Sequence, residues 1–203
     1  MPEPPTAEAL HSLYGEPSYR ARAKEMTALD SHARAFIALS PFLVIATADA
    51  GGHCDAAPRG DAPGFVSVLD SGRLLIPDRR GNNRIDSLGN IAANPEVGLL
   101  FLVPGIQETL RVNGPAEITL DPALLEPLAV DGKPPRSALL VTVREVFFHC
   151  GKALIRSDLW NPARHIPPAG FPSLGKILAD EIEGIEAAAC DLSIQDAYKT
   201  QLY

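Results

Sequence analysis

Short apolar runs recur along the chain, separated by turns that contain glycine, proline or aspartate. Runs of this length with many branched residues predict β-strands, and the short turns between them favour antiparallel hairpins. The predicted strands cover residues 42–48, 53–58, 65–69, 72–77, 97–103, 108–114 and 137–149. We therefore expect a mainly β fold with flanking helices, in the form of an antiparallel barrel or half-barrel of about six strands.

Apolar residues at helical spacing predict helices on both sides of the strands and between two of them. Asp30 or Ser31 is expected to cap the helix before the first strand. The predicted helices cover residues 7–14, about 19–40, 85–93, 121–128 and 173–188. The expected parts of the chain are a helical extension at 1–28, a central domain at 29–160, and a proline-rich linker with a C-terminal helix at 161–203.

The composition fits one domain with a substantial core, because 46% of the 203 residues are apolar. The formal net charge is -7 and there is no sustained basic stripe, which argues against nucleic acid as a partner. No apolar run reaches the length of a membrane span, and the first residues lack the features of a signal peptide. We expect a soluble, cytoplasmic protein with no membrane partner.

Three cysteines without CxxC spacing are typical of a reducing compartment. The pairs His53-Cys54 and His149-Cys150 suggest a metal site as one hypothesis. Neighbouring side chains on a strand point to opposite faces and cannot both reach one ion, so we predict no metal. The motifs of dinucleotide-binding folds, P-loops, α/β-hydrolases and zinc proteases are absent.

The loop after strand 72–77 is unusual for an acidic chain. Residues 78–84 include three arginines, one glycine and two asparagines, directly before a helix N-terminus whose free N–H groups favour an anion. This pattern predicts a phosphate-binding loop. The alternative is an ordinary surface loop in which Asn82 or Asn83 caps the helix.

Strand 108–114 alternates polar and apolar residues, which puts Thr109, Arg111 and Asn113 on one face. A cation on that face could neutralise the electron-rich edge of a cofactor. Arg111 could equally be an exposed residue paired with Glu108 or Glu117. The residues alone leave both interpretations open.

Several segments, taken in order, resemble the pyridoxamine 5'-phosphate oxidase family of FMN-binding split barrels. The resemblance covers about 29–160 and is closest to the general FMN-binding branch rather than to the vitamin B6 enzymes. Its segments are Phe42 to Thr47, Gly72 to Pro77, Asn94-Pro95-x-Val97-x-Leu99-Leu100-Phe101, Leu110 to Gly114 and Glu145 to Gly151, together with the loop Pro77-Asp78-Arg79-x-Gly81-Asn82-x-Arg84.

The resemblance implies a six-stranded split barrel and a homodimer that binds FMN where two barrels meet. Asn82 and Asn83 stand where the B6 oxidases have an Arg-Lys pair on the phosphate, so other arginines would supply the charge. Thr109 stands at a glutamine position facing the flavin and His149 lies near a tryptophan position. The implied cofactor-binding residues are Arg59, Ile76, Pro77, Asp78, Arg79, Arg80, Asn82, Asn83, Arg84, Thr109, Arg111, His149, Lys152 and Trp160.

The expected function is that of an FMN-dependent oxidoreductase acting on an unidentified small molecule. The substrate-binding Arg-x-x-x-x-Lys strand and the basic, tryptophan-containing C-terminus of the B6 oxidases are not reproduced at 59–64 and 199–203. No residue is named as a catalytic acid or base. The alternatives are a non-catalytic flavin-binding or sensor protein and a haem-binding split barrel with His149 as the axial ligand.

Overall fold

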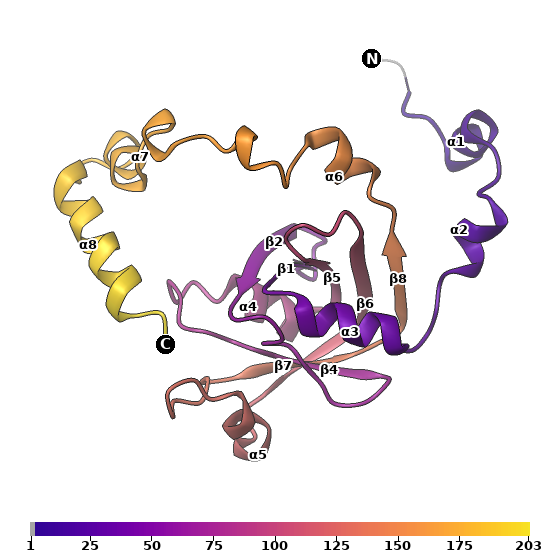
Figure 1. Ribbon diagram of the computed structural model, residues 1–203, viewed down its shortest axis with the longest axis horizontal. Coiled ribbons are helices and arrows are strands. Elements are labelled where there is room, and N and C mark those ends of the chain that lie inside the picture. The colour runs from indigo at the N-terminus through magenta and orange to yellow at the C-terminus, as the bar shows by residue number, and fades with distance from the viewer. Residues whose placement is uncertain (1–2) are drawn as a thin grey trace.

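The computed structural model of the protein describes residues 3–203 (Figure 1). The strands are β1 (Phe42–Ala48), β2 (Cys54–Gly60), β3 (Ser67–Val68), β4 (Arg73–Pro77), β5 (Glu96–Leu102), β6 (Thr109–Thr119), β7 (Ala138–Thr142) and β8 (Glu145–His149). The α-helices are α1 (Ala7–Tyr14), α2 (Tyr19–Ala23), α3 (Ser31–Leu39), α4 (Asp86–Ala93), α5 (Pro122–Leu125), α6 (Lys152–Ser157), α7 (Leu174–Glu181) and α8 (Ala187–Thr200).

All strand pairs are antiparallel, and the strand order is β2-β1-β5-β6-β7-β4-β3 with β8 also paired to β6. The prediction of an antiparallel split barrel with flanking helices is therefore confirmed, and the sheet is not closed. The run 137–149, expected as one strand, forms both β7 and β8. It is interrupted because the Val143 N–H turns to the Gly72 carbonyl and the Arg144 N–H to the Asn113 carbonyl.

Strand β6 is longer than predicted and belongs to both halves of the sheet. Residues 109–113 pair with β8 and residues 116–119 pair with β7. Gly114 lies at the change of partners, where a Cβ atom would collide with the Thr142 carbonyl oxygen. Only glycine fits here without a shift of β7.

The main core lies between the strands and α3. The fully buried side chains of Leu43 and Phe101 pack in the same cluster as Phe36 and Ile37 of α3. Asp30 caps α3 by accepting a 2.8 Å hydrogen bond from the Ala33 N–H, which confirms one of the two predicted caps. A second cluster attaches α5 beneath β4 and β7 and consists of Leu75, Leu125, Leu128 and Ala138.

Two helical arms extend from the barrel (Figure 1). The helix expected over about 19–40 is wrong as one element, because residues 24–30 between α2 and α3 are not helical and Met26 pairs with Val146 of β8. The helix expected at 173–188 is likewise two helices, separated by a turn with Gly184 at φ 87°. Among residues 3–203, no helix combines the length and hydropathy needed to cross a membrane.

Candidate functional site

A cavity of about 830 Å³ opens where β2 and β4 end. Its walls come from the end of β2, the loop from β4 to α4, and the loop before β7, together with Tyr203 from the far end of the chain. Six cationic residues line it: Arg59, Arg79, Arg80, Arg84, Lys133 and Arg136. Three carboxylates accompany them: Asp55, Asp78 and Asp86. A chain of net charge -7 thus concentrates an excess of positive charge in this cavity.

The backbone of the loop before α4 is held in an unusual conformation. Asn83 and Ile85 both have left-handed dihedrals, with φ of 58° and 53°. Ile85 occupies the N-cap position of α4 and provides no side-chain hydrogen bond, so the alternative in which Asn82 or Asn83 caps the helix is wrong. Asn82 instead accepts a 3.1 Å bond from the Arg84 N–H. The first N–H groups of α4 therefore have no side-chain cap, which favours an anion at that end.

The arginines of the loop differ in how firmly they are held. Arg79 donates through Nε to Asp61 at 2.6 Å and through Nη1 to the Leu128 carbonyl at 2.9 Å. The side chains of Arg79 and Asp61 are only 17% and 3% exposed. Arg84 is largely exposed and bonds Asp86 at 2.9 Å, so Arg84 is much freer to turn towards a ligand than Arg79.

Two further residues of the cavity interact electrostatically. Burial raises the pKa of the Asp78 carboxyl, and the positive charge of Arg59 opposes that shift. Within residues 3–203, the Arg59 guanidinium donates only to the neighbouring Pro58 carbonyl, at 2.9 Å. Arg59 therefore keeps most of its hydrogen-bonding capacity for a ligand.

A second group of candidate residues lies on the face shared by β6 and β8. The register sets Thr109 opposite His149 and Arg111 opposite Phe147. The Arg111 guanidinium lies 4.3 Å from the Phe147 ring centroid and 3.5 Å from Glu145. Its partner is thus Glu145, and the suggested pairing with Glu108 or Glu117 is wrong.

Two buried polar atoms, one on β6 and one just before it, lack a hydrogen-bond partner within the described residues. They are Arg111 Nε, a donor, and Gln107 Oε1, an acceptor. Buried polar groups are rarely left unpaired, so these two atoms are exceptional. The Arg111 side chain as a whole is 41% exposed, so the rest of its guanidinium can reach an outside group. Burial, followed by the charges of Arg111 and Lys24, lowers the pKa of His149 and keeps its imidazole neutral near neutral pH.

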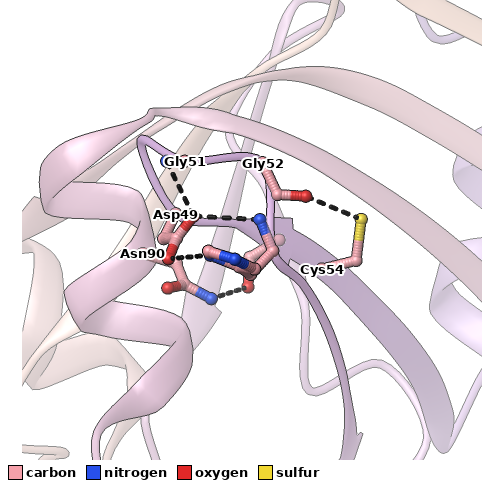
Figure 2. A network of polar contacts seen from close by, with 7 residues as sticks. Asp49, Gly51, Gly52, Cys54 and Asn90 are labelled. Atoms are coloured by element: carbon pink, nitrogen blue, oxygen red, sulfur yellow. Dashed lines mark hydrogen bonds and ion pairs between the residues drawn. The ribbon is translucent and has the colours of Figure 1, made fainter.

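Helix α4 packs against the hairpin between β1 and β2 (Figure 2). Asp49 accepts bonds from the Gly51 and His53 N–H groups and from His53 Nδ1, at 2.8 to 2.9 Å. Asn90 of α4 donates to Thr47 at 3.0 Å. The Cys54 thiol lies 3.7 Å from the Gly52 carbonyl. Residues 3–203 contain no group of three or more His, Cys, Asp or Glu side chains that could hold a metal ion.

The family model for pyridoxamine 5'-phosphate oxidase matches residues 29–150, more than half of the chain. The chain belongs to this family. No curated protein matches it. Among solved structures, a variant of HupZ from Group A Streptococcus has a TM-score of 0.50 and 17% identity, covering 61% of this chain and 100% of that chain.

Two further structures have lower scores. A proposed pyridoxamine 5'-phosphate oxidase from Lactobacillus delbrueckii has 21% identity and a TM-score of 0.46, covering 60% of this chain and 95% of that chain. An FMN-binding protein from Syntrophomonas wolfei has 12% identity and a TM-score of 0.41, covering 57% of this chain and 82% of that chain. At these identities the structural likeness concerns the fold alone.

Within the pyridoxamine 5'-phosphate oxidase fold, the predicted site residues form two separate groups. The first lines the cavity and consists of Arg59, Pro77, Asp78, Arg79, Arg80, Asn82, Asn83 and Arg84. The second comprises Thr109, Arg111 and His149 on the β6–β8 face. Lys152, at the exposed start of α6, and Trp160, which donates to the Ile106 carbonyl at 2.8 Å, lie outside the cavity lining. Ile76 belongs to neither group, because it is fully buried in β4 opposite Leu139.

Several residues of the site were not predicted from the sequence. Lys133 and Arg136 flank two prolines just before β7, the strand that pairs with β4. Two cations so close to the start of a strand were a signal in the sequence for an anion site. Gln107 lies in the bend two residues before β6 and packs against Gly151, so strand alternation could not place it. Tyr203 has no local signal, since its position depends on the path of the whole C-terminal arm.

Proposed function

We propose that the protein is an FMN-dependent oxidoreductase that binds the flavin between two copies of the chain and acts on a small molecule. The observation that carries the proposal is the cationic cavity at the uncapped start of α4, in a member of the pyridoxamine 5'-phosphate oxidase family. A phosphate monoester carries about two negative charges at neutral pH, and guanidinium groups and helix N-termini are its usual partners.

The chemical fit favours a phosphate at the loop and a flavin ring nearby. Arg84 and Arg59 would turn towards the phosphate, since neither is fixed by a buried partner, and Nη2 of Arg79, which is free within residues 3–203, would meet it from a fixed position. The cavity volume of about 830 Å³ lies within the range of cofactor sites. FMN, when bound, supplies the hydride- or electron-carrying ring, and the protein supplies position and electrostatics.

The second group of residues would complete the site from the partner chain. The Arg111 side chain is 41% exposed, so its guanidinium can donate to an acceptor outside its own chain, and the electron-rich pyrimidine edge of a flavin is such an acceptor. Arg111 does not line the cavity of its own chain. A site made from the cavity of one chain and the β6–β8 face of another would use both groups.

A homodimer also agrees with the surface of the two arms. Large apolar side chains are strongly exposed there, as they would be on a surface that another chain covers. The most exposed of them are Leu13, Tyr14, Tyr19, Ile166, Phe171 and Leu192. The proposed dimer would cover these side chains.

The first test is the absorbance spectrum of the purified protein and of two arginine variants. We expect flavin bands near roughly 370 and 450 nm and about one FMN per chain. Arg84→Ala is expected to weaken FMN binding about tenfold or more, because it removes a charge-assisted bond to the phosphate. Arg144→Ala is the matched control: this arginine pairs with Glu96 on the surface and does not line the cavity. A Soret band would favour the haem-binding alternative.

The second test asks whether the flavin lies between two chains. Arg84→Ala and Arg111→Ala chains are co-expressed, so that each mixed dimer carries both substitutions in one site and none in the other. With random pairing, about a quarter of all sites regain wild-type FMN affinity if the site is shared. If both residues act within one chain, no site regains it.

A further inference from the structure

The C-terminal arm returns to the cationic loop with its last residues (Figure 1). Helix α8 ends at Thr200, and Gln201 then accepts a 2.9 Å hydrogen bond from Arg80 Nη2. Two residues later, the Tyr203 hydroxyl donates to Asp61 Oδ1 at 2.7 Å. These contacts join segments 121 and 142 residues apart in the chain.

Asp61 connects Tyr203 to the loop arginine. Its Oδ2 accepts from Arg79 Nε, while its Oδ1 accepts from the Tyr203 hydroxyl and from the Ala62 N–H at 2.7 Å. Because the Asp61 side chain is only 3% exposed, water is a poor substitute for any of these donors. Loss of the phenol would therefore leave the Asp61 carboxylate less firmly fixed, and Arg79 with it, because Arg79 is bonded to that carboxylate.

Arg79 is held in a way that leaves part of its guanidinium available. Nε and Nη1 are bonded to Asp61 and to the Leu128 carbonyl, whereas Nη2 has no hydrogen-bond partner in the described part of the chain. The Tyr203 ring lies over the same guanidinium, 5.6 Å from its carbon, and lines the cavity. A fixed arginine with one free edge is preorganised to meet an anion.

We propose that Tyr203 is a positioning residue of the cavity: through Asp61 it holds Arg79 ready for the anionic group of a ligand, and its ring forms the wall beside that ligand. The ligand is a phosphate ester with a planar ring, and its identity as FMN rests on the proposed function. Gln201 supports the same wall by orienting Arg80 with a neutral amide, which leaves the charge of Arg80 uncompensated.

The first experiment measures FMN release from the full-length protein by stopped-flow flavin fluorescence. Tyr203→Ala is expected to increase the release rate about tenfold with little change in the association rate, as for loss of a hydrogen bond to a charged group. Tyr198→Ala is the matched control, since this tyrosine lies on α8, is 63% exposed and does not line the cavity. Equal release rates for Tyr203→Ala and Tyr198→Ala would overturn the proposal.

The second experiment needs no flavin. The NMR signal of Arg79 Nε–H is followed in the wild type and in Tyr203→Phe while inorganic phosphate is added. Tyr203→Phe keeps the ring but removes the donor, so we expect a broadened Arg79 signal and weaker phosphate binding; an unchanged signal and affinity would refute the positioning role. A wild type that binds phosphate in this way but takes no FMN would reject the proposed function and leave the role of Tyr203 supported.

Discussion

The buried ion pair between Asp61 and Arg79 allows a quantitative prediction about stability. Arg79→Ala would leave the Asp61 carboxylate, 3% exposed, without its cation. Breaking a buried pair from one side typically costs about 3 to 5 kcal/mol. We expect about 3 kcal/mol, the lower end, because Arg79 is 17% exposed and Asp61 keeps its bonds from Tyr203 and the Ala62 N–H.

Urea unfolding followed by circular dichroism measures this loss, with Arg79→Ala, Asp61→Ala and the double variant forming a cycle. The double variant should lose less stability than the two single variants lose together, and the difference, which is the coupling energy of the pair, should be about 1 to 3 kcal/mol. Arg22→Ala serves as the control, because Arg22 pairs with Glu16 on the surface of the N-terminal arm. Equal losses for Arg79→Ala and Arg22→Ala would refute the reasoning. A large loss would mean that deleting Arg79 cannot serve as a clean test of FMN binding.

Three further predictions concern the sheet and two titrating groups. Gly114→Ala should lower stability by about 3 kcal/mol or more in the same unfolding assay, since its methyl group has no space against β7. Lys24→Ala should raise the pKa of His149 in an NMR titration, because it removes one of the positive charges that lower this pKa. Since folding lowers the pKa of His149, its contribution to stability should be lost as the pH falls below the ordinary histidine pKa of 6.5. Arg59→Ala should raise the pKa of Asp78 further, measured by carboxyl-carbon NMR.

The acid side of the stability profile depends on Asp61. Burial raises the pKa of this carboxyl, but bonds from Tyr203, the Ala62 N–H and Arg79 outweigh burial and bring it below its ordinary value of 3.8. A carboxyl with a lowered pKa stabilises the fold above its unfolded pKa and loses that effect as pH falls through the folded one. Acid unfolding below about pH 3.8 should therefore be less steep in Asp61→Asn than in the wild type.

The sheet could be predicted from the sequence because each strand has a clear local pattern of residues. Apolar runs bounded by turns determine which segments pair as hairpins, and the polar face of Thr109 and Arg111 follows from alternation alone. The division of 137–149 into β7 and β8 could not be predicted in this way. It depends on which earlier strand each half meets, and that is a property of the assembled sheet.

The cationic loop was also visible in the sequence, whereas the roles of its arginines were not. Arg79 and Arg84 are equivalent by composition, yet Arg79 pairs with a carboxylate 18 residues earlier and Arg84 with its near neighbour Asp86. Charge partners at such separations follow from how β2 and β4 end beside one another. The contact of Tyr203 with Asp61 spans 142 residues and is harder still to anticipate.

The sharing of β6 between both halves of the sheet limits how the protein can diverge. One residue inserted before Gly114 would move the outward side chains of 109–113 to the core face of the sheet, while 116–119 would keep their register with β7. Natural variants should therefore keep the length of this strand and change it by substitution alone. Insertions and deletions should accumulate instead in exposed turns outside the core and the cavity, such as Pro104-Gly105.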